Sequence, residues 1–235
     1  MTLLNKYPLR YVFLEILLSY FIVTRISPFD NIDVNLWNFD KNHYYYWIYS
    51  AFLILFIVYF SKLTSSYDFR EEFSIPSFKP IFIWRAFLIF VKLLICLFFT
   101  LIILYLCILY CLPESVRLWV EVGGSDFVWN IGSKQSLFLM VITSLFTGGI
   151  EELFYRAFII TKLKQVGIAS LITVLISSLI FAYGHFYYGF VGFFVALIFG
   201  VILSYIYLIH KNIYYSIFVH SFYNIFVSVL LFLLN

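Results

Sequence analysis

Six polar side chains in the second half of the sequence have types that could do chemistry. They are Glu151, Glu152, Arg156, His185, His220 and Asn224. All six stand in strongly apolar stretches, where an ionisable side chain costs several kcal/mol and is a functional-site hypothesis by default. Together they offer carboxylates, imidazoles and an amide, which are the groups that acid–base catalysis uses.

The spacing of the acidic residues separates their expected roles. Helical residues advance by about 100° each, so Glu152 and Arg156, four positions apart, share a face and are expected to form an ion pair. Glu151 is turned about a quarter of a circle away and is left over. In a low-dielectric pocket such a carboxylate can act as a general base. The alternative is that both glutamates and Arg156 form a structural charge cluster.

The two histidines also occur in pairs at four-residue spacing. Phe181 lies one turn before His185, and Asn224 lies one turn after His220. This spacing places an aromatic ring beside the first imidazole and a hydrogen-bonding amide beside the second. A single histidine near a helix end is more often interfacial than catalytic. Four hydrogen-bonding groups on three apolar helices favour one shared site instead.

These residues resemble the motifs of the CPBP family, which comprises CAAX proteases and bacteriocin-processing enzymes and is also called the Abi family. The family's motifs are Glu-Glu-x-x-x-Arg, Phe-x-x-x-His and His-x-x-x-Asn or Asp, in that order on separate helices. They match here at 151–156, 181–185 and 220–224 without departure. The resemblance covers about residues 136–234.

The resemblance implies an intramembrane endopeptidase that hydrolyses peptide bonds with a glutamate-activated water and no covalent acyl intermediate. It implies that Glu151 and His185 position and deprotonate this water. It also implies that His220 and Asn224 stabilise the oxyanion. The supporting residues that it implies are Glu152, Arg156 and Phe181.

A zinc site is the chemical alternative for the same residues. Two glutamates and two histidines could hold this metal, because nitrogen and oxygen ligands suit it. The sequence contains no His-Glu-x-x-His, and the family resemblance favours the metal-free route. We therefore expect no cofactor.

The elements that must position these groups are expected to be membrane helices. Of the 235 residues, 64% are hydrophobic and 11% are charged, whereas soluble domains have about 45–50% apolar and about 25% charged residues. This composition excludes a soluble globular protein. The apolar runs are continuous rather than alternating, which predicts helices and not a barrel. The net charge of +3 is thinly spread and does not indicate nucleic-acid binding.

A bilayer crossing needs about 20 apolar residues, which predicts an all-α bundle of about seven transmembrane helices in a single membrane domain, 1–235. The predicted helices are 8–25, 44–61, 82–112, 136–163, 167–186, 190–209 and 213–234. The motif-bearing catalytic part is then 136–234. Lys and Arg divide eight against four between alternate connections. This bias predicts a cytoplasmic N-terminus and an outside C-terminus in the cell membrane.

The predicted helix ends conflict with a site at a single membrane depth. At about 1.5 Å per residue, Glu151 and His220 lie roughly 10–18 Å from the inner helix ends, whereas His185 lies about 27 Å from its own. Two repairs fit the sequence. The fifth helix could start with an interfacial stretch around 166–171, or glycines 148–149 could bend the fourth helix.

The leading prediction is an endopeptidase in the lipid bilayer that acts on a peptide or a membrane-anchored protein. The second is a non-catalytic bacteriocin-immunity or sensor-modulating membrane protein on the same fold, and the third is a small transporter or channel. The complete motifs disfavour the second, and the clustering of ionisable residues disfavours the third. Outside the cluster, Glu15 and Lys92 are expected to form a structural pair, with snorkelling or a substrate entrance as alternatives. The oligomeric state is not readable.

Overall fold

The structure is a computed structural model that describes residues 9–25, 48–49, 51–53, 55–57, 59, 69–111, 113–114 and 133–234. Within these ranges every regular element is helical and none is a strand, which confirms the predicted all-α fold class. The elements in chain order are α1 (Leu9–Arg25), α3 (Phe69–Glu72), α4 (Ile81–Cys111), α6 (Lys134–Glu152), the π-helix η2 (Leu153–Ile160), α7 (Thr161–Gln165), α8 (Ser170–Gly184), the 3-10 helix η3 (Phe186–Tyr188), α9 (Gly189–His210) and α10 (Ile213–Leu234).

Four helices in the described residues are long and apolar enough to cross a membrane. They are Ile81–Cys111, Lys134–Gln165, Gly189–His210 and Ile213–Leu234. The shorter α1 and α8 match the predicted ranges 8–25 and 167–186 within a few residues. The predicted helix 44–61 lies partly outside the described residues. The protein is therefore a membrane protein with at least four candidate spans, and the count of seven remains a prediction.

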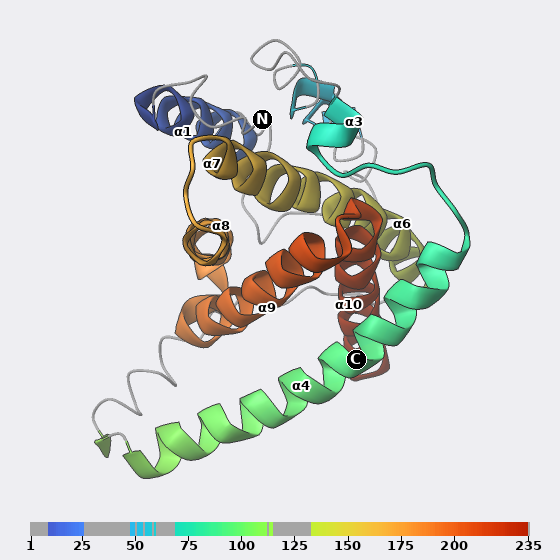
Figure 1. Ribbon diagram of the computed structural model, residues 1–235. Helices are drawn as coiled ribbons and strands as arrows, with labels where there is room; N and C mark the ends of the chain where they lie inside the picture. The colour runs from blue at the N-terminus through green and yellow to red at the C-terminus, as the bar shows by residue number, and fades with distance from the viewer. Residues whose placement is uncertain are drawn as a thin grey trace.

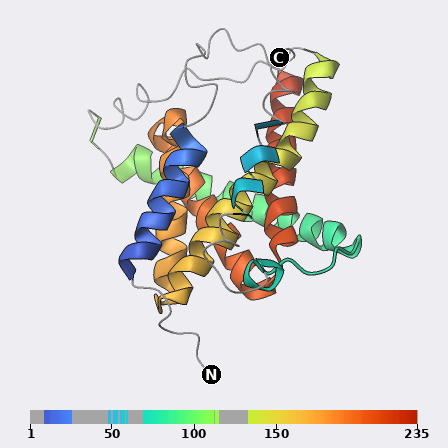
Figure 2. The same ribbon diagram turned by 90° about the horizontal axis from the view of Figure 1, so that it is seen from above.

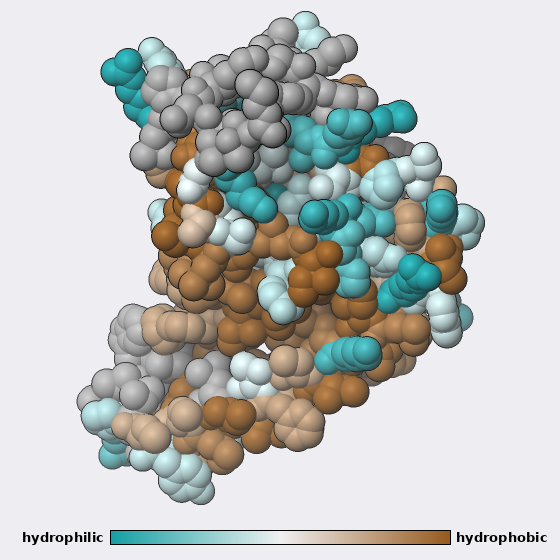
Figure 3. Space-filling view, viewed as in Figure 1, coloured by the Kyte–Doolittle hydropathy of each residue, from teal (hydrophilic) through white to brown (hydrophobic). Residues whose placement is uncertain are grey.

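The outer surface of the molecule is strongly apolar. Helix α4 runs along one edge (Figure 1), and large side chains such as Trp84, Phe98 and Tyr105 on it are more than half exposed. Hydrophobic residues predominate over α4 and α9 on the face seen in Figure 3, while hydrophilic residues gather around α3. Contiguous apolar area of this size is unusual on a soluble protein. Lipid acyl chains provide the apolar surroundings that this exposed surface requires.

The continuous helical run α6–η2–α7 forms the centre of the bundle. Figure 2 shows α10 lying along α6, and α8 packs against α9. Gly148 permits the close approach of α6 and α10, because a methyl group there would lie 2.5 Å from Ser221 Oγ and 3.1 Å from the carbonyl oxygen of Ile217. At the next residue, Gly149, no side chain or neighbouring helix among the described residues comes within 4 Å of the same position. The close packing of α6 on α10 therefore requires a glycine at position 148 but not at position 149.

Gly148→Ala is expected to destabilise the protein by about 1–3 kcal/mol, because it overpacks the contact between α6 and α10. Gly149→Ala is the matched control. It is expected to be neutral or stabilising by up to about 1 kcal/mol, since alanine is the better helix former. Thermal unfolding of the two purified variants in the same detergent compares them. Equal unfolding temperatures would show that the close approach at Gly148 is not needed.

A second buried polar cluster joins the N-terminal helices to the end of the central run. Lys162 Nζ lies 3.2 Å from Glu15 Oε1 of α1 and 3.8 Å from Glu72 Oε1 of α3. Gln165 Nε2 donates to Glu72 Oε1 at 2.6 Å. The predicted pairing of Glu15 with Lys92 is therefore wrong. Glu15 faces the bundle interior and meets Lys162, whereas Lys92 lies on the exposed side of α4.

Lys162→Met is expected to lower the free energy of unfolding by about 3–5 kcal/mol, because it leaves two carboxylates without the buried ammonium between them. Lys164→Met changes an exposed lysine on the same helix and is expected to change it by less than about 0.5 kcal/mol. Denaturant titration in detergent measures both. If the two variants unfold alike, this cluster does not hold the N-terminal helices in place.

Candidate functional site

The structure brings Glu151, His185 and His220 together from three helices. Glu151 Oε2 lies 3.9 Å from His185 Nε2 and 3.8 Å from His220 Nε2. His220 is buried, while the side chains of Glu151 and His185 are 25% and 20% exposed. One buried carboxylate oxygen therefore faces two imidazole nitrogens, in a cluster whose Glu151 and His185 side chains are partly exposed. Glu151 is the carboxylate that the sequence predicted to lie outside the ion pair of Glu152 with Arg156.

The expected conflict in depth does not arise, because the helices are tilted relative to one another. Figure 1 shows α8 nearly end-on while the central run lies across the view, so residue counts from helix ends do not measure one common depth. In addition, α8 begins only at Ser170, and His185 follows its last helical residue, Gly184. Residues 166–169 lie outside the helix, whereas α6 continues through 148–149.

The orientation of His185 is set by its own helix. Its Nδ1 lies 2.9 Å from the carbonyl oxygen of Phe181. A carbonyl can only accept, so Nδ1 carries the hydrogen, and in the neutral imidazole Nε2 is left as the acceptor that faces Glu151. The ring of Phe181 also packs on the imidazole, with 4.4 Å between ring centroids. The predicted aromatic neighbour of His185 is therefore confirmed.

Glu152 connects the predicted ion pair to the site. Its Oε2 lies 3.2 Å from Arg156 Nε, which confirms the expected pairing, and its Oε1 lies 2.9 Å from His220 Nδ1. All three side chains are at least 97% buried. Sequence reasoning missed the contact with His220, because spacing within one helix does not reveal which residue of another helix packs against it. Glu152 thus holds His220 through Nδ1, while Nε2 of the same ring faces Glu151.

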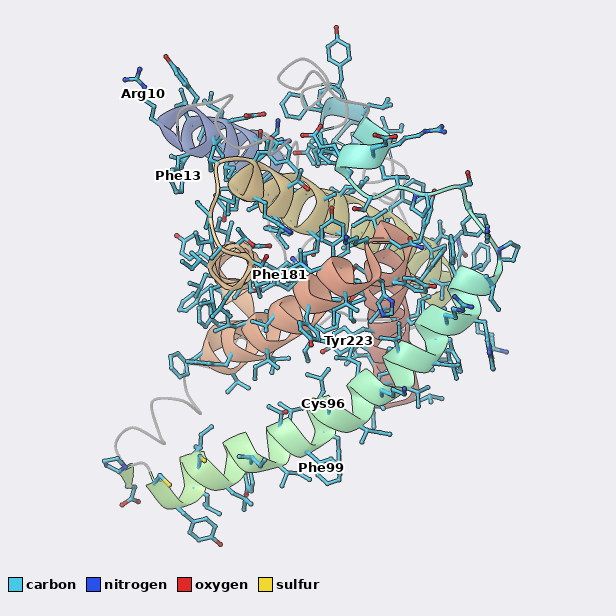
Figure 4. All side chains as sticks on the ribbon, viewed as in Figure 1. Arg10, Phe13, Cys96, Phe99, Phe181 and Tyr223 are labelled. Carbon is cyan, nitrogen blue, oxygen red and sulfur yellow. The ribbon has the colours of Figure 1, made fainter. Side chains whose placement is uncertain are left out.

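Aromatic rings complete the surroundings of the buried charges. The Arg156 guanidinium lies 4.5 Å from the ring centroid of Phe181, a cation–π contact. Figure 4 labels Phe181 on the side of α8 that faces α9. Phe181 and Phe199 both meet the His220 ring edge-on, at 5.9 and 5.2 Å between centroids. Phe199 belongs to no predicted motif, and nothing in its spacing on α9 marks it.

Asn224 lies on α10 one turn after His220, as predicted, and is partly buried. The backbone carbonyl oxygen of Asn224 accepts a hydrogen bond from Ser228 Oγ at 2.8 Å. The helix therefore places the Asn224 side chain one turn from the imidazole. Its predicted role in oxyanion stabilisation remains a prediction.

The zinc alternative has little support from the arrangement of donors. Within the described residues, no group of three or more His, Cys, Asp or Glu is arranged to hold a metal ion. We therefore derive no step through a metal.

Comparison with known proteins bears on the segment that carries the site. Residues 133–226 match the family model described as type II CAAX prenyl endopeptidase Rce1-like. The predicted resemblance to the CAAX proteases is confirmed. The match covers less than half of the 235 residues, begins at the start of α6 and includes all three motifs. No curated protein and no solved structure matches the chain. The similarity is thus to a family of membrane-associated peptidases, over the part of the chain that forms the site.

Proposed function

We propose that this protein is an intramembrane glutamic endopeptidase that hydrolyses a peptide bond in a membrane-associated protein or peptide precursor. The observation that carries the proposal is the convergence of Glu151 Oε2 with the Nε2 atoms of His185 and His220 at 3.9 and 3.8 Å. The family match over residues 133–226 supports the same class of reaction. The proposed site needs no residue from outside that segment.

The separations at this site suit a bound water. They exceed the range of a direct hydrogen bond, about 2.7–3.2 Å, and a water that bridges such groups keeps good hydrogen bonds to each. In this mechanism the water donates one hydrogen bond to Glu151 and one to the unprotonated Nε2 of His185. Glu151 takes the proton as the water oxygen attacks the carbonyl carbon. It then gives that proton to the leaving amine as the C–N bond breaks, which yields an amine and a carboxylic acid that keeps the second hydrogen of the water.

His220 and Asn224 would stabilise the oxyanion that forms in this step. With Nδ1 directed at Glu152, His220 can donate from Nε2 only if its ring carries both protons. Oxyanion donors of this kind are each worth about 10²–10³ in turnover. Glu152 and Arg156 then act by holding His220.

Comparative peptide mass spectrometry of membranes tests the proposal and can reveal the substrate. Membranes containing the unaltered protein, Glu151→Gln or Glu71→Gln are compared, with Glu71 as an exposed glutamate on α3. New peptide termini are expected in the first and third samples and absent from the second. If all three contain the same termini at equal protein levels, the protein is not a protease acting through Glu151. A phenotype that survives Glu151→Gln would favour the non-catalytic role on the same fold.

A further inference from the structure

The helix that carries the acidic motif changes its geometry immediately after Glu152. Residues Leu153–Ile160 form a π-helix, and all eight are buried. π-Helical turns are rare and occur frequently at functional sites. This segment contains neither glycine nor proline, so its own sequence supplies no backbone reason for leaving the α-helical geometry. A contact from outside the helix can supply one.

Ser177 of α8 makes such a contact. Its Oγ donates a hydrogen bond of 2.6 Å to the carbonyl oxygen of Tyr155, in the middle of the π-helix. Ser177 is fully buried and Tyr155 nearly so. The two residues are 22 positions apart and belong to different helices. A buried hydroxyl that bonds a backbone carbonyl from a neighbouring helix fixes the position of that carbonyl.

Ser177 is the first member of a row along one face of α8. Ser177 and Phe181 lie four residues apart on the same side of α8, and His185, the residue that caps the end of this helix, continues the spacing. Each meets the central run: Ser177 at the Tyr155 carbonyl, Phe181 at the Arg156 guanidinium 4.5 Å away, and His185 at Glu151, 3.9 Å away. The row therefore extends beyond Phe-x-x-x-His by one further turn.

The π-helix also separates two ends of the central run that must meet different partners. Before it, Glu152 bonds His220 of α10. After it, Lys162 meets Glu15 and Glu72. A single residue of helical register corresponds to a rotation of about 100°. The π-helical geometry therefore sets the rotation of the acidic motif relative to the anchored end at Lys162.

We propose that Ser177 is a positioning residue for the proposed reaction. Its bond to the Tyr155 carbonyl holds the π-helical register and so holds Glu151 and Glu152 against the two imidazoles. This inference rests on the proposed function, because the reaction gives the positioning its consequence. A displacement of about 1 Å in an active site can cost about 10²-fold in rate.

Ser177→Ala tests this role, with Ser178→Ala as the matched control. Ser178 is the next residue, is equally buried, and faces Ser204 of α9 at 3.5 Å instead of the π-helix. The side-chain nitrogen signals of His185 and His220 are recorded by NMR on 15N-histidine-labelled protein in detergent. The yield of the new peptide termini that are absent from Glu151→Gln membranes is measured for the same variants. Thermal unfolding is measured on the purified proteins.

Ser177→Ala is expected to shift the nitrogen signals of both site histidines and to lower the yield of termini by about 10²-fold. Ser178→Ala is expected to leave both unchanged, even where it lowers the unfolding temperature by the same amount. Unchanged histidine signals in Ser177→Ala, or equal shifts in Ser178→Ala, would overturn the inference. If the unaltered protein produces no Glu151-dependent termini, the proposed function fails, and the inference of a role in catalysis fails with it. The NMR comparison still decides whether Ser177 positions the histidines.

Discussion

Glu151→Gln is expected to lower peptide-bond hydrolysis by about 10²–10⁴-fold, the contribution of a positioned general base. Glutamine has nearly the same shape and can still accept a hydrogen bond, but it cannot take the proton from the attacking water. Glu151 makes no ion pair with Arg156, which pairs with Glu152 instead. The loss should therefore fall on turnover, while membrane insertion and folding are retained. Cleavage of the identified substrate by purified protein measures the effect.

Glu71→Gln serves as the control for that comparison, since it removes an exposed glutamate on α3. It should leave both turnover and thermal stability unchanged. Retained cleavage by the Glu151→Gln variant would refute the assignment of the base. A large fall in its unfolding temperature would instead favour the structural charge cluster as the main role of this residue.

Arg156→Ala is expected to lower the amount of folded protein strongly. It removes the guanidinium beside the fully buried Glu152 and also empties the position against Phe181. Removing one partner of a buried ion pair costs about 3–5 kcal/mol, which is a large share of the stability of an ordinary domain. The amount of protein in membranes and its unfolding temperature in detergent both report this loss.

The double variant Arg156→Ala/Glu152→Gln separates charge from packing. Neutralising the carboxylate removes the uncompensated buried charge, so part of the lost stability should return, although His220 loses its ionised partner. Double-mutant comparison isolates such a pairwise energy. If the double variant is no more stable than Arg156→Ala, the loss comes from packing against Phe181 rather than from the ion pair.

The local features of the site could be predicted from the sequence. Spacing of four residues placed Glu152 beside Arg156 and Phe181 beside His185, and both contacts are present. Helical periodicity relates residues one turn apart with little ambiguity. The fold class and most helix ranges also followed, because long apolar runs have few alternatives in a bilayer.

Contacts between helices could not be predicted in the same way. On a soluble helix a polar face shows which side is buried, but on a lipid-covered helix both sides are apolar. The sequence therefore does not indicate the partners of Lys162, and it wrongly favours Lys92 as the partner of Glu15. The contacts of Glu152 with His220 and of Ser177 with the Tyr155 carbonyl join residues 68 and 22 positions apart. Only the packing of the helices brings them together.

Cleavage in water enriched with 18O tests the central claim most directly, because the claim is that the site adds a water molecule to a peptide bond. Purified protein is incubated with the substrate identified from membranes, and the new C-terminal carboxylate is analysed by mass spectrometry. One 18O atom should enter each product molecule formed by the unaltered protein and by Glu71→Gln, while Glu151→Gln should form almost no product. Unlabelled product, or labelled product formed equally by Glu151→Gln, would contradict a water activated at Glu151.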